Sequence, residues 1–168
     1  MAPDRLQIAL EHHRAGRLTR AEVGYREILQ DRPDDPEANH WLGVLTFQAG
    51  DAAGAVALLE RAVSARPDDP AFQFNLGQAL LASGRASDAV RPLQRSTEIE
   101  PLRGESWMAL GVALLARKGA DDATAAVAAM KRARDAGSGS GSPRTTRRRP
   151  SVPTRARRSR SRPTGACA

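Results

Sequence analysis

The sequence has few aromatic residues, one cysteine, two lysines and no long apolar run. Aromatic residues make up 4% of the 168 residues, so a hydrophobic core must consist mainly of Ala, Leu and Val. The single cysteine, Cys167, excludes an internal disulfide. No stretch approaches the ~18 apolar residues of a transmembrane helix, and the N-terminal residues lack the apolar run of a secretory signal. These absences predict a soluble, cytoplasmic protein.

Charge is distributed unevenly along the chain. There are 26 basic and 19 acidic residues, which gives a net charge of +7. Residues 137–168 hold nine arginines and no acidic residue, and subtracting nine from +7 leaves −2 for residues 1–136. We therefore expect a slightly acidic folded part over residues 1–136, followed by a strongly basic tail.

A period of about 34 residues organises the folded part. The pattern of residues 42–67 returns at residues 76–101, and a weaker copy with Ile8-Ala9 precedes it. Self-similarity at a fixed period is typical of repeat architectures. Small and apolar residues at shared positions are expected to pack the repeats closely: Leu42, Gly43 and Ala55, then Leu76, Gly77 and Ala89, then Leu110, Gly111 and Ala123.

Each copy divides into two helical patterns with a turn between them. Apolar residues recur at helical spacing before and after Gly50, a residue type common just past a helix end. Pro-Asp-Asp-Pro at residues 33–36 and again at 67–70 stops one helix and caps the next. In the fourth copy the turn, Lys118-Gly119, is shifted by one residue, and the last helix is expected over about residues 120–136.

The repeated residues resemble the tetratricopeptide repeat family over about residues 2–136. The family signature is matched by Trp107, by the three Leu-Gly pairs and by closing prolines at Pro33, Pro67 and Pro101. The resemblance implies an all-α, right-handed α-solenoid of about four helix–turn–helix repeats, at about residues 2–35, 36–69, 70–103 and 104–136. The first unit, with Ile8-Ala9 in place of Leu-Gly, is expected to cap the array.

The resemblance also implies a concave groove, lined by the first helix of each pair, in which a partner binds. Aligning the copies places aromatic and aliphatic side chains on this groove, and such residues often anchor binding patches. The alternative is that they pack between adjacent first helices. The predicted groove residues are His40, Trp41, Val44, Phe47, Phe74, Asn75, Gln78, Met108 and Val112.

Two known types of groove fit this sequence poorly. Family members that hold the acidic C-termini of chaperones use lysines, arginines and asparagines, whereas this groove has no lysine. Arrays of protein O-glycosyltransferases carry an asparagine before each Leu-Gly pair. Here only Asn75 matches, whereas Trp41 and Ala109 occupy the corresponding positions of the second and fourth repeats. A bound peptide is therefore expected to make mainly hydrophobic contacts.

Residues 137–168 change composition abruptly to Gly/Ser and then Arg, and are predicted to be disordered. Three interpretations stay open: a solvated tail without a partner, a tail that contacts polyanions such as nucleic acid, or a truncated or frame-shifted end. The tail has no aromatic residue for base stacking. The candidate polyanion contacts are Arg147, Arg148, Arg149, Arg157 and Arg158.

The sequence predicts no enzyme, metal site or cofactor. Adjacent His12 and His13 point about 100° apart on a helix, and His40 has no partner at zinc-ligand spacing. The leading hypothesis is a non-catalytic scaffold that binds a protein, a peptide or a second copy of itself. The alternatives are an accessory array of a larger transferase, of glycosyltransferase or sulfotransferase type, or a polyanion-binding adaptor acting through the tail.

Overall fold

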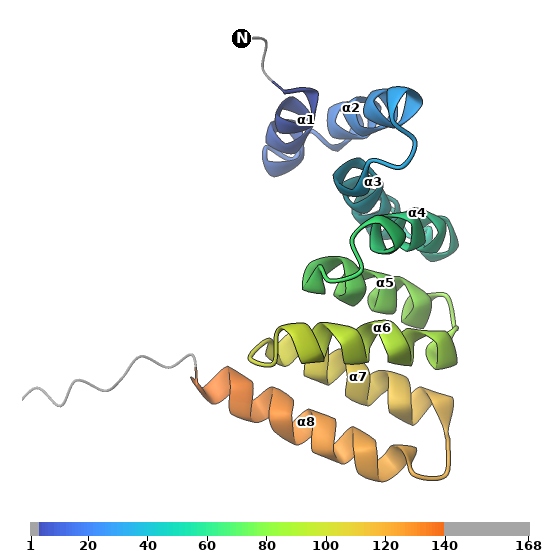
Figure 1. Ribbon diagram of the computed structural model, residues 1–168, viewed down its shortest axis with the longest axis vertical. Coiled ribbons are helices and arrows are strands. Elements are labelled where there is room, and N and C mark those ends of the chain that lie inside the picture. The colour runs from blue at the N-terminus through green and yellow to red at the C-terminus, as the bar shows by residue number, and fades with distance from the viewer. Residues whose placement is uncertain (1–3, 140–168) are drawn as a thin grey trace, which may run out of the picture.

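The computed structural model describes residues 4–139, and side chains through Gly137. This part of the chain folds into eight α-helices that pair in sequence and stack along the long axis of the molecule, from α1 and α2 at one end to α8 at the other (Figure 1). The helices are α1 (Arg5–Arg14), α2 (Leu18–Asp31), α3 (Pro36–Gln48), α4 (Ala52–Ala65), α5 (Pro70–Ala82), α6 (Ala86–Ile99), α7 (Gly104–Arg117) and α8 (Asp122–Gly139).

The all-α solenoid predicted from the sequence is confirmed. None of its helices, within the described residues, combines the length and the apolar character needed to cross a membrane. Helix α8 continues to Gly139, through the first residues of the predicted Gly/Ser linker. The five arginines proposed as polyanion contacts lie outside the described residues: Arg147, Arg148, Arg149, Arg157 and Arg158.

The turn inside each helical pair uses one backbone position with a positive φ. Gly16, Gly50 and Gly84 adopt φ values of 70°, 91° and 79°. Glycine reaches this left-handed region without the steric cost that a Cβ imposes. At the same point of the fourth pair, Lys118 adopts φ 59°. The last turn is therefore built with a residue poorly suited to its backbone conformation.

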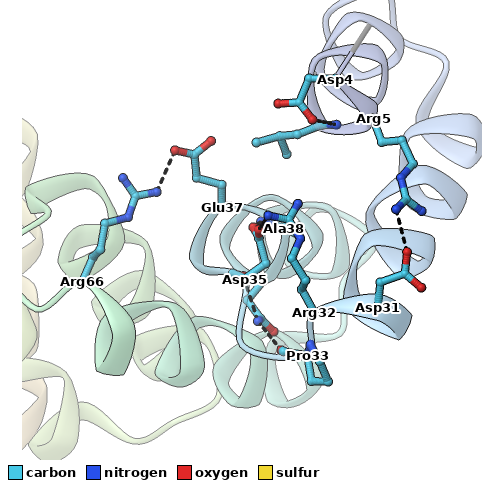
Figure 2. A network of polar contacts seen from close by, with 11 residues as sticks. Asp4, Arg5, Asp31, Arg32, Pro33, Asp35, Glu37, Ala38 and Arg66 are labelled. Atoms are coloured by element: carbon cyan, nitrogen blue, oxygen red, sulfur yellow. Dashed lines mark hydrogen bonds and ion pairs between the residues drawn. The ribbon is translucent and has the colours of Figure 1, made fainter. Parts of the chain in front are cut away.

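Aspartates and prolines connect one pair to the next. Asp35 accepts a hydrogen bond from the backbone N–H of Ala38 and so caps α3, and Asp69 caps α5 in the same way. Around the first junction, Arg5 pairs with Asp31 and Arg66 pairs with Glu37 (Figure 2). These exposed ion pairs contribute little to stability individually, so the caps dominate the local energetics.

One hydrogen bond is repeated at every junction by a different side chain. Asn39 Nδ2 donates to the carbonyl of Pro33 at 2.8 Å. Gln73 Nε2 donates to Pro67, and Trp107 Nε1 donates to Pro101, each also at 2.8 Å. The three donors occupy the same position of successive repeats, which is that of the signature tryptophan. The position therefore requires an N–H donor of suitable reach, which explains why Asn and Gln replace Trp here.

The core runs along the stack between the helices. Leu59 and Leu93 are almost completely buried, beneath glycines of the preceding helix. A Cβ on Gly43 would lie 2.8 Å from Leu59 Cγ, and one on Gly77 would lie 2.4 Å from Leu93 Cγ. The glycines thus let the two helices of a pair approach at a distance that a larger residue would prevent.

The fourth pair departs from the predicted register. Ala123, expected to pack like Ala55 and Ala89, is exposed, and Ala126 is the buried residue instead. A Cβ on Gly111 would meet Met130, as one on Gly77 would meet Leu93. In the second helix of the last pair, the buried positions are therefore occupied by residues about one helical turn further along the sequence than the repeat period predicts.

The cause of this shift is a longer turn between α7 and α8. Asp122, at the start of α8, accepts hydrogen bonds from the Arg117 guanidinium and from the backbone N–H of Gly119. This arrangement delays the first residue of α8 to Asp122, whereas the sequence predicted about residue 120. The pairing with Arg117 is also the main reason that the pKa of Asp122 is lowered to about 2.

Candidate partner-binding groove

The first helices of the second, third and fourth pairs follow one another along the array, and α5 contacts both α3 and α7. Between α5 and α7 lies an open, largely apolar depression of about 530 Å³, which we call the α5–α7 hollow. Four of the nine predicted groove residues line it, together with three others. Its lining consists of Phe74, Gln78, Leu81, Glu105, Met108, Ala109 and Val112.

The hollow has a fixed floor and an accessible rim. Phe74 is only 8% exposed, and the guanidinium of Arg103 lies over its ring, 4.7 Å from the centroid. Met108 and Val112 are 48% and 45% exposed. A fixed aromatic floor beside exposed aliphatic side chains can receive an apolar side chain of a partner, and burial contributes about 25 cal/mol per Å² of apolar surface.

His40 does not contribute to an accessible groove surface, although the sequence placed it there. Its ring is 4% exposed, stacks on Phe72 at 4.3 Å between centroids, and receives a hydrogen bond at Nε2 from Asn75 Nδ2 at 2.7 Å. Burial lowers the pKa of His40 to about 4. His40 is therefore a neutral packing residue between α3 and α5, as in the alternative that the sequence left open.

The other predicted residues of α3 and α5 also take part in packing. Trp41 is half-buried and makes edge contacts with His13 at 5.4 Å and His40 at 4.9 Å, which joins α1 to α3. Phe47 packs against the main core, and Val44 is half-buried. The side-chain amide of Asn75 donates its hydrogen bond to His40. The one asparagine that matched the peptide-binding pattern of O-glycosyltransferase arrays therefore already has a partner within the chain.

Sequence reasoning missed Glu105, Ala109 and Arg103. Glu105 lies on the rim of the hollow, Ala109 lines it, and Arg103 covers Phe74 from the loop before α7. Glu105 stands three residues before Met108 and seven before Val112, one and two helical turns away on the same face. This spacing was the available signal for Glu105, whereas the position of Arg103 depends on the loop and had none.

The titratable groups near the groove have structural roles. The Tyr25 hydroxyl lies 3.2 Å from His13 Nδ1, and burial raises the pKa of Tyr25 to about 12 while it lowers that of His13. Neither group lines the hollow. Across residues 4–137, no cluster of His, Cys, Asp and Glu side chains could hold a metal ion. The chemistry that this surface offers is therefore apolar contact, with an ion pair at its edge between Arg103 and Glu105, 3.8 Å apart.

Comparison with known proteins gives two kinds of match. The family model described as Tetratricopeptide repeat matches residues 12–73 and 46–111, which together span more than half of the chain. No curated protein matches the sequence. The fold matches many solved structures, among them two of MamA and one of an O-GlcNAc transferase.

The structure MamA MSR-1 C2 is 22% identical, with a TM-score of 0.69 over 81% of this chain and 76% of that chain. The structure of MamA from residue 41 to the end, from Desulfovibrio magneticus RS-1, is 20% identical with a TM-score of 0.71. That match covers 82% of this chain and 76% of the MamA chain. The O-GlcNAc transferase of Thermobaculum terrenum is 34% identical, with a TM-score of 0.60 over 66% of this chain but only 21% of the transferase. The MamA likeness concerns the fold, and the transferase likeness concerns a small part of a larger protein.

Proposed function

This chain belongs to the tetratricopeptide repeat family, and on that basis we propose that it is a non-catalytic scaffold that binds a protein partner at the α5–α7 hollow. The observation that carries the proposal is the exposure of Met108 and Val112 beside the buried ring of Phe74. Exposed apolar side chains around a depression mark interaction sites more often than scattered surface residues do. Among the other predicted groove residues, His40 and Phe47 are packing residues and Asn75 is hydrogen-bonded to His40.

The lining of the hollow indicates which segment fits. Aliphatic walls and an aromatic floor favour a helix or an extended segment with large apolar side chains at the contact. The Glu105 carboxylate on the rim lies 3.8 Å from the Arg103 guanidinium, so the rim carries an ion pair rather than a single negative charge.

The test is affinity capture with mass spectrometry on the full chain and on two matched variants. Val112→Glu places a charge in the hollow, whereas Ala57→Glu places the same charge at an exposed position of α4. We expect Val112→Glu to lose the captured protein and Ala57→Glu to keep it, with equal helix content by circular dichroism. Equal capture by both variants would contradict the assignment of the hollow.

A second candidate function is the accessory array of a transferase. The 34% identity with part of the O-GlcNAc transferase favours it. In that case the captured protein is a glycosyltransferase, and adding the chain to the purified enzyme raises its activity on a protein acceptor but not on a short free peptide. An unchanged activity on both acceptors would exclude this role for the captured enzyme.

A further inference from the structure

A cavity of about 530 Å³ lies beside the second helices of the array, away from the α5–α7 hollow. Its walls are formed by the end of α4, the loop that follows it, and parts of α5 and α6. Val63, Leu76 and Pro92 contribute apolar surface, and Gln73 and Arg95 contribute polar groups. The cavity shares no lining residue with the hollow, so the two are separate sites.

Gln73 stands in this cavity at the position that a tryptophan occupies in the next repeat. Gln73 donates a hydrogen bond to the carbonyl of Pro67, and Trp107 donates one to the carbonyl of Pro101, both at 2.8 Å. The indole of a tryptophan continues beside its donor nitrogen as a six-membered ring, whereas a glutamine side chain ends at its amide. Gln73 therefore makes the hydrogen bond of the tryptophan without supplying the ring.

The fourth pair shows how the ring is held when it is present. Trp107 is half-buried and packs against the main core, and the guanidinium of Arg132 lies over its ring, 4.7 Å from the centroid. In the shifted register of the last pair Met130 takes the place of Leu93, so Arg132, two residues later, takes the place of Arg95. Arg95 lines the cavity, so the third pair keeps the counterpart of the cation that covers the ring.

Arg95 is held at the cavity by two carboxylates. Its guanidinium pairs with Asp68 at 2.5 Å and with Glu98 at 3.1 Å. Such pairing leaves the flat face of a guanidinium available, since Arg103 pairs with two glutamates and still lies over the ring of Phe74. A cation over the face of an aromatic ring is attracted by the negative charge of that face. Arg95 is therefore placed to attract a ring that enters the cavity.

We propose that this cavity binds a planar aromatic ring supplied from outside the chain, in the place that Trp107 fills in the fourth pair. The ring packs on the apolar walls at Leu76 and Pro92, beside the Gln73 amide, and the Arg95 guanidinium lies over its face. The volume of the cavity is within the range of sites that bind small ligands. Because the cavity and the α5–α7 hollow are separate, this inference goes beyond the proposed function and does not depend on it.

Titration of the isotope-labelled full chain with indole, followed by amide NMR shifts, tests the site. We expect saturable shifts at Leu76, Gln94 and Arg95, with a dissociation constant of about 1 mM or below. Gln73→Trp supplies the ring from within the chain and should abolish these shifts. Gln48→Trp adds the same ring at an exposed position outside the cavity and should keep them. Absence of saturable shifts in the original chain, or binding at the cavity that survives Gln73→Trp, overturns the proposal.

A second pair of variants leaves the size of position 73 unchanged and tests the cation. Arg95→Gln should weaken indole binding by about two- to fivefold, which is the effect of a cation–π contact at a partly exposed site. Arg61→Gln changes the counterpart of Arg95 in the preceding repeat, outside the cavity, and should bind indole as the original chain does. Equal affinities of these two variants would overturn the placement of the ring against Arg95.

A second probe distinguishes the two sources of such a ring, an aromatic side chain of a partner polypeptide and a free aromatic compound. N-acetyltryptophanamide carries an amide group on each side of its ring-bearing carbon, as a residue within a polypeptide does, whereas indole is the ring alone. Binding of N-acetyltryptophanamide at least as tightly as indole supports a side chain of a partner as the occupant. Binding of indole alone supports a free aromatic compound, and binding of neither probe overturns the proposal.

Discussion

The third and fourth helical pairs are built on the same repeated residues, yet they present different surfaces. Val90 and Val127 are counterparts, and so are Phe74 and Met108, but the first member of each couple is buried and the second is exposed. The difference comes from the neighbouring pair: among residues 4–139, the third pair has a neighbour on each side, whereas the fourth has one on its N-terminal side only. In such an array, the place of a residue along the stack decides whether an apolar side chain packs or stays available for binding.

The largest expected difference between the two pairs concerns the side chains beneath the glycines. Leu93 is completely buried, whereas its counterpart Met130 is half-buried. We expect Leu93→Ala to reduce the free energy of unfolding by about 2–5 kcal/mol, and Met130→Ala by less. Urea unfolding followed by circular dichroism measures both. A larger loss for Met130→Ala would show that the last pair is packed as tightly as the third.

Acid pH should destabilise the folded chain through His40, the buried residue of the third-pair junction whose counterpart in the fourth pair is the exposed Met108. The pKa of His40 is about 4 in the folded chain, against about 6.5 when unfolded, so the folded state favours the neutral ring. Its contribution is complete above pH 6.5 and is lost as pH falls towards 4, by up to about 3 kcal/mol.

The check compares urea unfolding at pH 7.5 and 4.5 for the original chain and for His40→Met, which copies the fourth pair. The original chain should lose more stability on acidification than the variant. Equal losses of stability would mean that the His40 ring is accessible to solvent, and would support its predicted place on the groove surface.

Close helix approach should matter more in the third pair than in the fourth. A Cβ on Gly77 would lie 2.4 Å and 2.5 Å from two carbons of Leu93, while one on Gly111 would lie 2.9 Å from Met130 Cγ, in a flexible side chain. We expect Gly77→Ala to cost about 1–3 kcal/mol, since overpacking exceeds the gain in helix propensity. Gly111→Ala should cost less in the same unfolding measurement, and the reverse order would contradict this account of the packing.

The smallest effect is expected at the last turn. Lys118 occupies the left-handed conformation that Gly84 provides in the third pair. Lys118→Gly should therefore stabilise the chain, by about 1 kcal/mol, and reduce hydrogen exchange at the start of α8. Destabilisation by this variant would indicate that the Lys118 side chain makes a contact worth more than the backbone strain.

The architecture could be predicted from the sequence because each repeated small residue has one structural role. Glycines such as Gly50 and Gly84 fit a positive φ, and Asp35 and Asp69 cap the following helices. Prediction failed in the fourth pair, where Lys118 replaces the turn glycine and Asp122 resets the start of α8. The shift of Ala123 to an exposed position follows from that turn.

The candidate site was predictable as a face of the array but not as a set of accessible residues. Aligning the repeats places His40, Phe74 and Met108 at one position, but it does not show how much of each the next helix covers. Asn75 matched a peptide-binding pattern, and its amide instead bonds to His40 across the α3–α5 interface. Such pairings depend on three-dimensional neighbours whose identities vary from one copy to the next.

Site-specific photo-crosslinking tests most directly whether the α5–α7 hollow is the partner-binding surface. A photoreactive amino acid placed at Val112 lies on the lining of the hollow, and the same group at Ala57 lies on exposed α4. We predict a covalent product with a protein partner, or with a second copy, from position 112 and none from position 57. A product formed from position 57 but not from position 112 would contradict the account.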